Sequence, residues 1–470
     1  MNKTARTLNL ISGCFLLSCT GNQERQQKVS QKSKELPNII FILSDDLGIG
    51  DLGCYGQKNF NTPNIDRLAE EGILFTNHYT GAPVSAPSRC TLITGLHTGH
   101  STIRQNHSQI DKSRISLSDS DYTIGMLARE AGYKTAIFGK WGVGEEGTDG
   151  VPNKRGFDEF MGYLNNDHCE FYYTDYLFEN MNGITLESNK DGHRGQYTHD
   201  LFTRSAKEFI KENQQSPFFI YLAYTIPHKR FEVPVEDSDP FIGKYISDGM
   251  ERYDSVRSVY AGMITRMDRH IGEIMDLLKD SGIDENTIVF FSSDNGAGVV
   301  GKDKLGSDYF NSNSLYRGYK GDLYEGGIHT PLIVRWPGKI KAGSTTGHIS
   351  AFWDFMPTLA GIAGIDKPET DGISYLPALL GRPDQEKHKY LYWEYTKEGI
   401  ASQAVRIGDF KVIVNNGTDS HVEVYNLLED PGENNDVSGS NPDIVEMGLA
   451  FFEEAHTENP HYPIKKSTAE

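Results

Sequence analysis

Four short apolar runs, each followed by polar residues, constrain the fold of this chain most strongly. They are residues 38–43, 135–138, 218–223 and 288–291. Unbroken apolar runs of this length are typical of strands buried on both faces, as in a parallel sheet covered by helices. Helical patterns lie between the runs, at residues 63–71 and at about 255–281. We therefore predict a doubly wound α/β domain.

Polar residues follow these predicted strands. They are Asp45, Asp46, Lys140, His228, Asp294 and Asn295. A single Asp pair after a strand more often forms a turn or a helix cap. The carboxyl ends of parallel strands, however, meet at one edge of a sheet, where ligands bind. The recurrence of polar residues at several strand ends therefore predicts one shared crevice.

The pattern changes from about residue 383. Short strands are predicted at residues 390–395, 403–407, 410–414 and 423–427, with a helix near 442–456. We predict a catalytic α/β domain at residues 37–382 and a smaller C-terminal subdomain at 383–470, made of an antiparallel sheet and one helix.

The N-terminus has the pattern of a targeting segment. Lys3 and Arg6 precede an apolar stretch at residues 8–17 that is too short for a membrane span. Its end resembles a bacterial lipoprotein signal, which implies cleavage before Cys19 and acylation of the Cys19 thiol. The alternative is a plain secretory signal. We predict a signal peptide at residues 1–18, a flexible tether at 19–36, and a lipid-anchored protein in the periplasm or on the outer surface of a bacterium.

Charge and cysteine content exclude other classes of function. The formal charge of −19 argues against nucleic acid or an anionic membrane surface as a partner, because both require a basic surface. The chain beyond the leader contains three cysteines, Cys54, Cys90 and Cys169. Their odd number and the lack of CxxC spacing indicate neither a disulfide framework nor a zinc site.

A short helix is predicted after Ser85. Pro87 stands at its third position and Gly95 closes it, so free backbone N–H groups near Ser85 would favour an anion. Arg89 would lie one turn further on. Taken alone, Ser85 is more often a helix cap.

This segment resembles the maturation signature of the formylglycine sulfatases, in the alkaline-phosphatase-like superfamily. The signature is Cys or Ser, any residue, Pro, Ser, Arg, with Thr-Gly shortly after. It is matched by Ser85, Pro87, Ser88, Arg89, Thr94 and Gly95. The resemblance spans about residues 37–430 and implies that a radical maturating enzyme of the serine type converts Ser85, not Cys90, to formylglycine.

The resemblance also implies a metal site. Asp45, Asp46, Asp294 and Asn295 match the family's metal ligands, together with the group derived from Ser85. Hard oxygen ligands suit calcium or magnesium rather than zinc.

By resemblance, Lys140, His228 and Lys320 surround the sulfate. Two ammonium groups and Arg89 would neutralise its charge, and His228 or Lys320 would protonate the departing alcohol oxygen. The alternatives are that each lysine is an ordinary solvated surface residue and that His228 has a structural role.

Two positions depart from the family pattern. Gly142 stands where a histidine is common, and His329 where an arginine often follows the Glu-Gly-Gly-Ile run. Whether another histidine, such as His168, replaces the missing one is left open.

Residues 156–173 are rich in polar and aromatic side chains and resemble stretches in sulfatases that act on sulfated galactose or N-acetylgalactosamine. Asn166, Asp167 and His168 are the predicted substrate contacts. The alternative is an ordinary loop that covers the domain.

The predicted reaction is hydrolysis of a carbohydrate sulfate ester. A hydrated aldehyde carries two hydroxyls on one carbon, so one can attack sulfur and the other can then expel sulfate. Unmodified Ser85 should therefore be nearly inactive. Two alternatives remain: a phosphodiesterase or phosphonate hydrolase of the same superfamily, and an unmatured glycan-binding lipoprotein.

Overall fold

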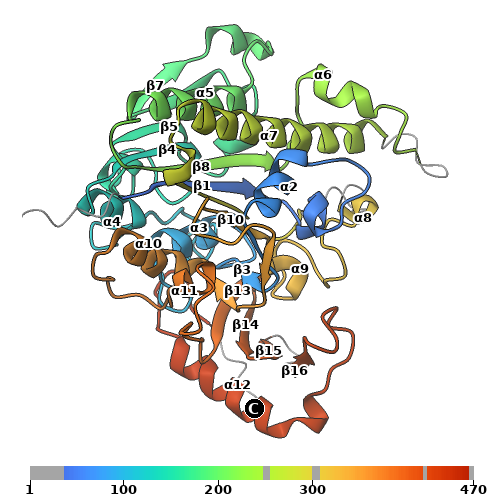
Figure 1. Cartoon of the computed structure of the whole chain (residues 1–470). Helices are drawn as coiled ribbons and strands as arrows, with labels where there is room; N and C mark the ends of the chain where they lie inside the picture. The colour runs from blue at the N-terminus through green and yellow to red at the C-terminus, as the bar shows by residue number, and fades with distance from the viewer. Residues whose placement is uncertain (1–35, 247–253, 299–306, 417–420, 465–470) are drawn as a thin grey trace, which may run out of the picture. The chain divides into compact units, whose positions relative to one another are not determined.

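A sheet of ten strands, counted within the described residues, forms the centre of the fold in this computed structural model (Figure 1). In spatial order the strands are β11 (Ser344–Thr346), β2 (Ile73–Phe75), β10 (Leu332–Arg335), β9 (Thr287–Ser293), β1 (Asn38–Asp45), β8 (Phe218–Pro227), β4 (Lys134–Lys140), β5 (Glu159–Tyr163), β6 (Tyr176–Glu179) and β7 (Asn182–Thr185). The central strands β9, β1, β8, β4 and β5 are parallel. The four predicted strands are confirmed as β1, β4, β8 and β9.

The structure describes residues 36–246, 254–298, 307–416 and 421–464. The predicted signal peptide, Cys19 and nearly all of the tether lie outside these residues. Among the described helices, none is both long and apolar enough to cross a membrane.

Two layers of helices cover the sheet (Figure 1). One layer consists of α2 (Pro63–Glu70), α5 (Thr198–Glu212) and α7 (Asp254–Asp280), and the other of α3 (Ser85–Thr94), α4 (Ile124–Glu130) and α10 (Phe355–Ala363). The remaining short helices are α6 (Val235–Ser238), α8 (Ser307–Phe310), α9 (Glu325–Ile328) and α11 (Leu376–Leu379). The two helices predicted between the strands are confirmed, as α2 and α7.

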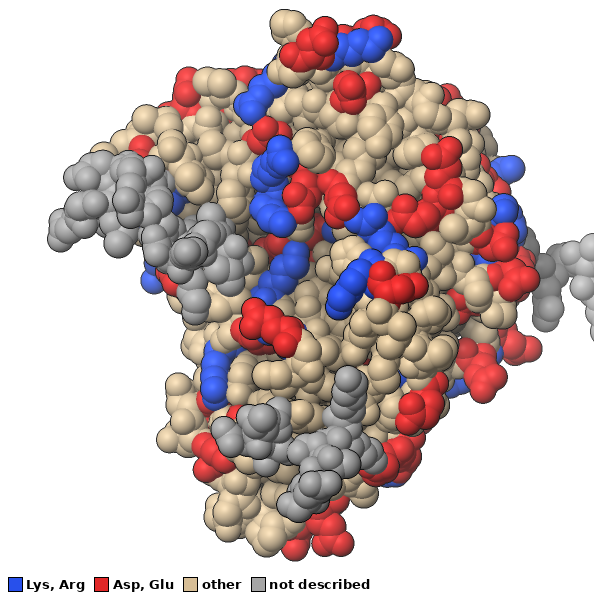
Figure 2. All heavy atoms as spheres, turned by 180° about the vertical axis from the view of Figure 1, so that it is seen from behind, with Lys and Arg blue, Asp and Glu red and all other residues tan. Residues whose placement is uncertain are grey.

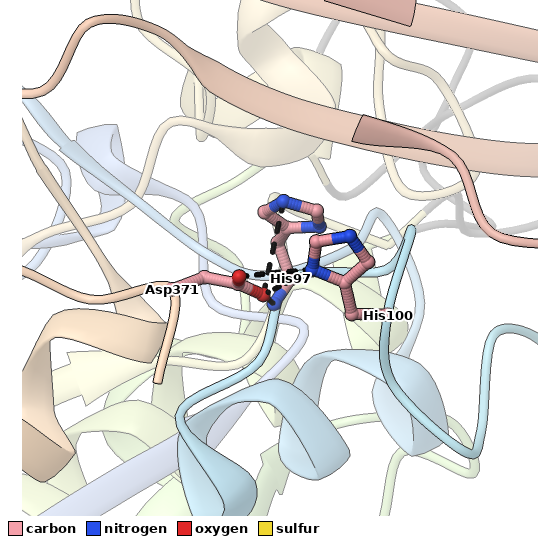
Figure 3. Close-up of side chains that lie close together, drawn as sticks. All are labelled: His97, His100 and Asp371. Carbon is pink, nitrogen blue, oxygen red and sulfur yellow. Dashed lines mark hydrogen bonds and ion pairs between the residues drawn. The ribbon is translucent and has the colours of Figure 1, made fainter. Parts of the chain in front are cut away.

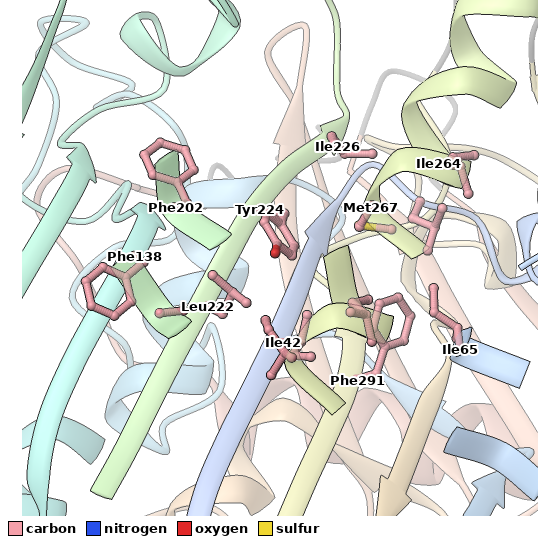
Figure 4. Close-up of a cluster of buried hydrophobic side chains, with 14 of the residues drawn as sticks. Ile42, Ile65, Phe138, Phe202, Leu222, Tyr224, Ile226, Ile264, Met267 and Phe291 are labelled. Carbon is pink, nitrogen blue, oxygen red and sulfur yellow. The ribbon is translucent and has the colours of Figure 1, made fainter. Parts of the chain in front are cut away.

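Alternating side chains of the central strands fill both cores. Ile42 and Leu222 point toward α5 and α7, where they meet Phe202 and Met267 (Figure 4). On the opposite face Phe41 packs edge-on against Phe355 of α10, at 4.6 Å between ring centroids. Burial on both faces explains the continuous apolar runs in the sequence.

The C-terminal region forms the predicted antiparallel sheet. Its strands are β13 (Leu391–Lys397), β14 (Ile400–Ile407), β15 (Phe410–Asn415) and β16 (Val422–Asn426), and α12 (Pro442–Ala455) packs on one face. On the other face, Trp393 packs against Tyr79 and Trp353, which precede this sheet in the chain. The paired strands β3 (His78–Tyr79) and β12 (Ser350–Ala351) lie beside these side chains.

The C-terminal end of α3 is tied to the loop at Asp371. The Gly95 carbonyl accepts hydrogen bonds from the backbone N–H of Asp371 and from the Thr370 hydroxyl. The Asp371 carboxylate in turn accepts from the backbone N–H of His97 and contacts the His100 ring at 2.9 Å (Figure 3). These bonds fix the helix that begins with Ser85.

This cluster makes stability depend on pH. Burial lowers the pKa of His97 to about 4, and outweighs the opposing effects of Asp371 and Glu394. His100 and Arg104 also face the ring and act in the same direction as burial. Because the folded-state pKa lies below the unfolded value of about 6.5, the unfolded chain binds the extra proton as pH falls.

We therefore expect His97 to reduce the free energy of unfolding by about 2 kcal/mol between pH 7 and pH 5. The measurement is urea unfolding of the wild type and of His97→Asn, which keeps an acceptor for the Gly99 N–H. The wild type should lose more stability over this interval than the variant. Parallel curves would contradict the assignment.

Candidate active site

The carboxyl ends of four parallel strands bring the predicted polar residues together. Asp45 ends β1, and Asp294 directly follows β9, where Ser44 pairs with Ser293. Lys140 ends β4, and His228 directly follows β8. The crevice therefore forms where the topology of a doubly wound sheet requires it.

Ser85 is the first residue of α3 and is only 2% exposed. Its Oγ donates a hydrogen bond to Asp45 Oδ1 at 3.2 Å. Arg89, one turn further along α3, is fully buried and donates to Asp294 Oδ2 through Nε and to Asp45 Oδ2 through its terminal nitrogen, both at 3.1 Å. The guanidinium thus fixes two carboxylates beside Ser85.

Three buried carboxylates share this small space. Burial raises the pKa of Asp46 and of Asp294, and the nearby cations oppose this only in part. For Asp45 the positive charges of Lys140, Arg89 and Lys320 outweigh burial and hold its pKa far below the usual range. Asp45 is therefore an anion, and the crowding of carboxylates favours a bound cation.

The remaining predicted residues contact the same carboxylates. Lys140 Nζ donates to Asp45 Oδ2 at 2.6 Å, and Lys320 Nζ lies 2.7 Å from Asp46 Oδ1. His228 Nε2 lies 3.7 Å from Asp46 Oδ2, while its Nδ1 contacts the carbonyl of Lys229. Burial, assisted by Lys320, lowers the pKa of His228 to about 3.

The donor set fits a hard divalent cation. The side-chain amide of Asn295 donates to Asp46 Oδ1 at 2.8 Å, but its Oδ1 is buried and, within the described residues, has no hydrogen-bond partner. Ligand atoms of Asp45, Asp46 and His228 all lie within 4.8 Å of one another. An orphaned amide oxygen beside carboxylates matches the ligands that calcium and magnesium prefer.

We expect Asn295→Ala to weaken calcium binding by about tenfold or more, because one neutral oxygen ligand is lost from an otherwise anionic set. Calorimetric titration of chelator-treated protein measures this. Asn182→Ala, at an exposed position on β7, is the matched control. Equal affinities in the two variants would remove Asn295 from the ligand set.

Gly142 has space for the missing side chain only at the expense of its neighbours. A Cβ there would lie 3.3 Å from Arg89 Cδ and 3.3 Å from Asn166 Oδ1. Asn166 Oδ1 is buried and has no partner among the described residues. Of the three predicted substrate contacts, Asn166 thus lies beside Gly142.

The other two predicted contacts lie further out. Asp167 pairs with Arg114, and its side chain is largely exposed. His168 is buried, stacks on Tyr176, and contacts Thr174 Oγ1 at 3.0 Å through Nε2. Both residues line an open cavity. Their roles as substrate contacts stay predictions.

His329 lies in a structural network. Its Nδ1 contacts Glu325 Oε2 at 2.9 Å, and Lys411 pairs with the same carboxylate group at 3.0 Å. Its Nε2 contacts the Thr76 carbonyl. The departure from arginine therefore concerns the contact of α9 with the C-terminal sheet.

Sequence reasoning missed polar residues that support the site. Asn106 Oδ1 accepts from the backbone N–H of Ala86, directly after Ser85, at 3.1 Å. The Thr80 hydroxyl contacts both Ser88 Oγ and the Asp294 carbonyl. Neither residue belongs to a spaced motif, so no pattern in the sequence marked them.

The surface carries both basic and acidic side chains, and the chain as a whole is negatively charged. On the face shown in Figure 2, Lys and Arg side chains are interspersed with Asp and Glu side chains. The cations that matter for an anionic substrate are instead the buried Arg89 and Lys140, with Lys320 at partial exposure.

The fold and this crevice define an alkaline-phosphatase-like α/β hydrolase. The sulfatase family profile matches residues 37–365, and the profile of the N-sulphoglucosamine sulphohydrolase C-terminal region matches residues 319–450. The chain belongs to the sulfatase family and is a sulfuric ester hydrolase.

Relatives cover most of the chain. The N-acetylgalactosamine-6-sulfatase of Canis lupus familiaris is 33% identical over 86% of this chain and 76% of its own length. The N-acetylgalactosamine-6-O-sulfatase of Bacteroides thetaiotaomicron is 30% identical over 97% of this chain and 100% of its own. The structure of Ps i-CgsB in complex with k-i-k-neocarrahexaose superimposes with a TM-score of 0.76, at 30% identity, over 89% of this chain and 92% of that one.

Proposed function

We propose that this enzyme hydrolyses a sulfate ester on a carbohydrate, galactose or N-acetylgalactosamine, and that Ser85 is first converted to formylglycine. The observation that carries the proposal is the position of Ser85, at the start of α3 and 3.2 Å from Asp45, with Arg89 and Lys140 on the same carboxylate. The N-acetylgalactosamine-6-sulfatases among the relatives support this choice of sugar.

The side chains of the crevice have three roles: they position the carboxylates, neutralise the sulfate and protonate the leaving group. Arg89 holds Asp45 and Asp294 in place, and Lys140 and Lys320 supply positive charge for the sulfate oxygens. His228 or Lys320 protonates the departing alcohol oxygen.

Asp45, Asp46, Asp294 and Asn295 are the residues that would hold calcium, or magnesium. When bound, the cation acidifies a coordinated hydroxyl and neutralises sulfate charge, and the hydrated aldehyde at position 85 provides a second hydroxyl on the same carbon.

The test is peptide mass spectrometry across Ser85, on protein produced anaerobically with a radical maturating enzyme of the serine type. Oxidation of serine to formylglycine removes two hydrogens, a loss of about 2 Da. Matured protein should release sulfate from sulfated galactose or N-acetylgalactosamine. An intact Ser85 under these conditions would favour the unmatured glycan-binding lipoprotein.

A phosphonate hydrolase is the second candidate within the superfamily. A phosphonate monoester hydrolase of Agrobacterium radiobacter shares the fold, with a TM-score of 0.65 and 22% identity. Matured protein that cleaves a phosphonate monoester faster than any sugar sulfate would support that function instead.

We also propose export and lipid attachment at Cys19, on the basis of the N-terminal sequence. Incorporation of labelled palmitate into the wild type, but not into Cys19→Ala, is the expected result. No label in the wild type would favour a plain secretory signal, and a label retained in the variant would place the lipid at another residue. From the sequence we also propose a division of the chain into a catalytic domain at residues 37–382 and a C-terminal subdomain at residues 383–470.

A further inference from the structure

A cavity of about 770 Å³ opens beside the catalytic crevice. It lies between the loop at residues 105–112 and the turn that joins β13 to β14. Gln109 Nε2 donates to Thr396 Oγ1 at 2.8 Å and connects the two walls. The volume falls in the range of about 300–1,000 Å³ that is usual for small-ligand sites.

Two contacts connect this cavity to the site. Asn106, in its lining, accepts from the backbone N–H of Ala86, the residue after Ser85. On the opposite wall, the Tyr395 phenol is close enough to Lys320 and Asp322 to interact electrostatically with both. A group attached to a sulfate near Ser85 and Lys320 would therefore extend into this cavity.

The lining contains carboxamides with unused hydrogen-bonding capacity. Gln105 is 8% exposed, and its side chain makes no hydrogen bond to any residue that the structure describes. The Asn416 Nδ2 atom is buried and likewise has no partner in the described ranges. Asn106 uses its oxygen on Ala86, which leaves its NH₂ group for a ligand. A buried polar atom such as Asn416 Nδ2 is normally satisfied, and the Gln105 and Asn106 carboxamides beside it can also bond to a ligand, so the lining indicates a ligand rich in hydroxyl groups.

The charges of the lining balance. Among the described residues of the lining, Lys112 is the one lysine, Glu398 the one acid and His107 the one histidine, and none is an arginine. Cations close by are already neutralised: Lys320 by Asp46 at 2.7 Å, and Lys397 by Asp322 at 2.6 Å. A second sulfate or a carboxylate would therefore meet one lysine, Lys112, which is balanced by Glu398, and the exposed imidazole of His107.

We infer that this cavity binds an uncharged sugar unit, so that the preferred substrate carries a neutral hexose or N-acetylhexosamine, rather than a uronic acid, next to the sulfated residue. The inference rests on the proposed function and adds the chemistry of the neighbouring unit. Tyr395 offers an aromatic face for the sugar ring, and Gln105, Asn106 and Asn416 offer hydrogen bonds to its hydroxyls.

The test uses two disaccharides with the same sulfated galactose, linked either to galactose or to glucuronic acid. Calorimetry on Ser85→Ala protein, which cannot mature, measures binding without turnover. We expect the neutral disaccharide to bind at least about tenfold more tightly, and matured wild type to show the same preference in kcat/KM. Equal or tighter binding of the uronate compound would overturn the inference.

Two variants separate the contributions. Gln105→Leu removes the carboxamide at similar volume and should weaken the neutral disaccharide about tenfold, with a smaller loss for the sulfated monosaccharide. Lys112→Ala should change the neutral disaccharide by less than about twofold. A larger loss in Lys112→Ala than in Gln105→Leu would show an anion-recognising cavity instead.

The same experiments separate a failure of the neutral-sugar inference from a failure of the proposed sulfatase function. Sulfate release from the monosaccharide without a preference for the neutral neighbour would overturn this inference alone. No release from any sugar sulfate by protein with a confirmed 2 Da loss at Ser85 would overturn the proposed function and this inference with it.

Discussion

Ser85→Ala is expected to lower sulfate release by at least about 1,000-fold, because alanine has neither a hydroxyl nor a route to the aldehyde. Ser85 Oγ makes one hydrogen bond, to Asp45, so the cost in folding free energy should stay near 1 kcal/mol. Sulfate release under saturating substrate measures the first effect, and urea unfolding measures the second.

Ser120→Ala is the control for this experiment, since Ser120 lies at an exposed position. It should keep the activity of the wild type. If Ser85→Ala were folded and retained more than a few per cent of the activity, the assigned position of the nucleophile would be wrong.

Arg89→Leu should have the largest effect on stability. Its guanidinium is fully buried and pairs with Asp45 and Asp294, both of which are also fully buried. Removing the cation leaves two carboxylates without their shared partner, which typically costs about 3–5 kcal/mol. Urea unfolding in the presence of a chelator measures this loss without a contribution from bound metal.

Arg89→Lys and Arg129→Leu complete the series. Lysine keeps the charge but cannot bridge two carboxylates and the Lys140 carbonyl, so an intermediate loss is expected. Arg129 is exposed on α4 and should change stability by less than about 1 kcal/mol when replaced by leucine. Similar losses at both arginines would mean that the buried ion pairs contribute little.

Only the tertiary structure could separate members of the candidate site that share one motif. Asn166 and His168 stand two residues apart in the sequence. Asn166 nevertheless lies beside Gly142, whereas the His168 ring contacts Thr174 Oγ1. The direction of a side chain in an irregular loop depends on its packing partners, and no periodicity encodes it.

The sequence by itself determined the parallel sheet and the crevice at its carboxyl edge. These follow from local physics: continuous apolar runs require burial on both faces, and the residues after them share one edge. The roles of the charged residues came from the resemblance of their motifs to the sulfatase family. The maturation signature around Ser85 is likewise contiguous. The cavity at Gln105, Asn106 and Asn416 was decided only by the tertiary structure. It forms where the loop at residues 105–112 contacts the β13–β14 turn, which lies nearly 300 residues later in the chain. Local sequence patterns do not predict contacts between segments so far apart.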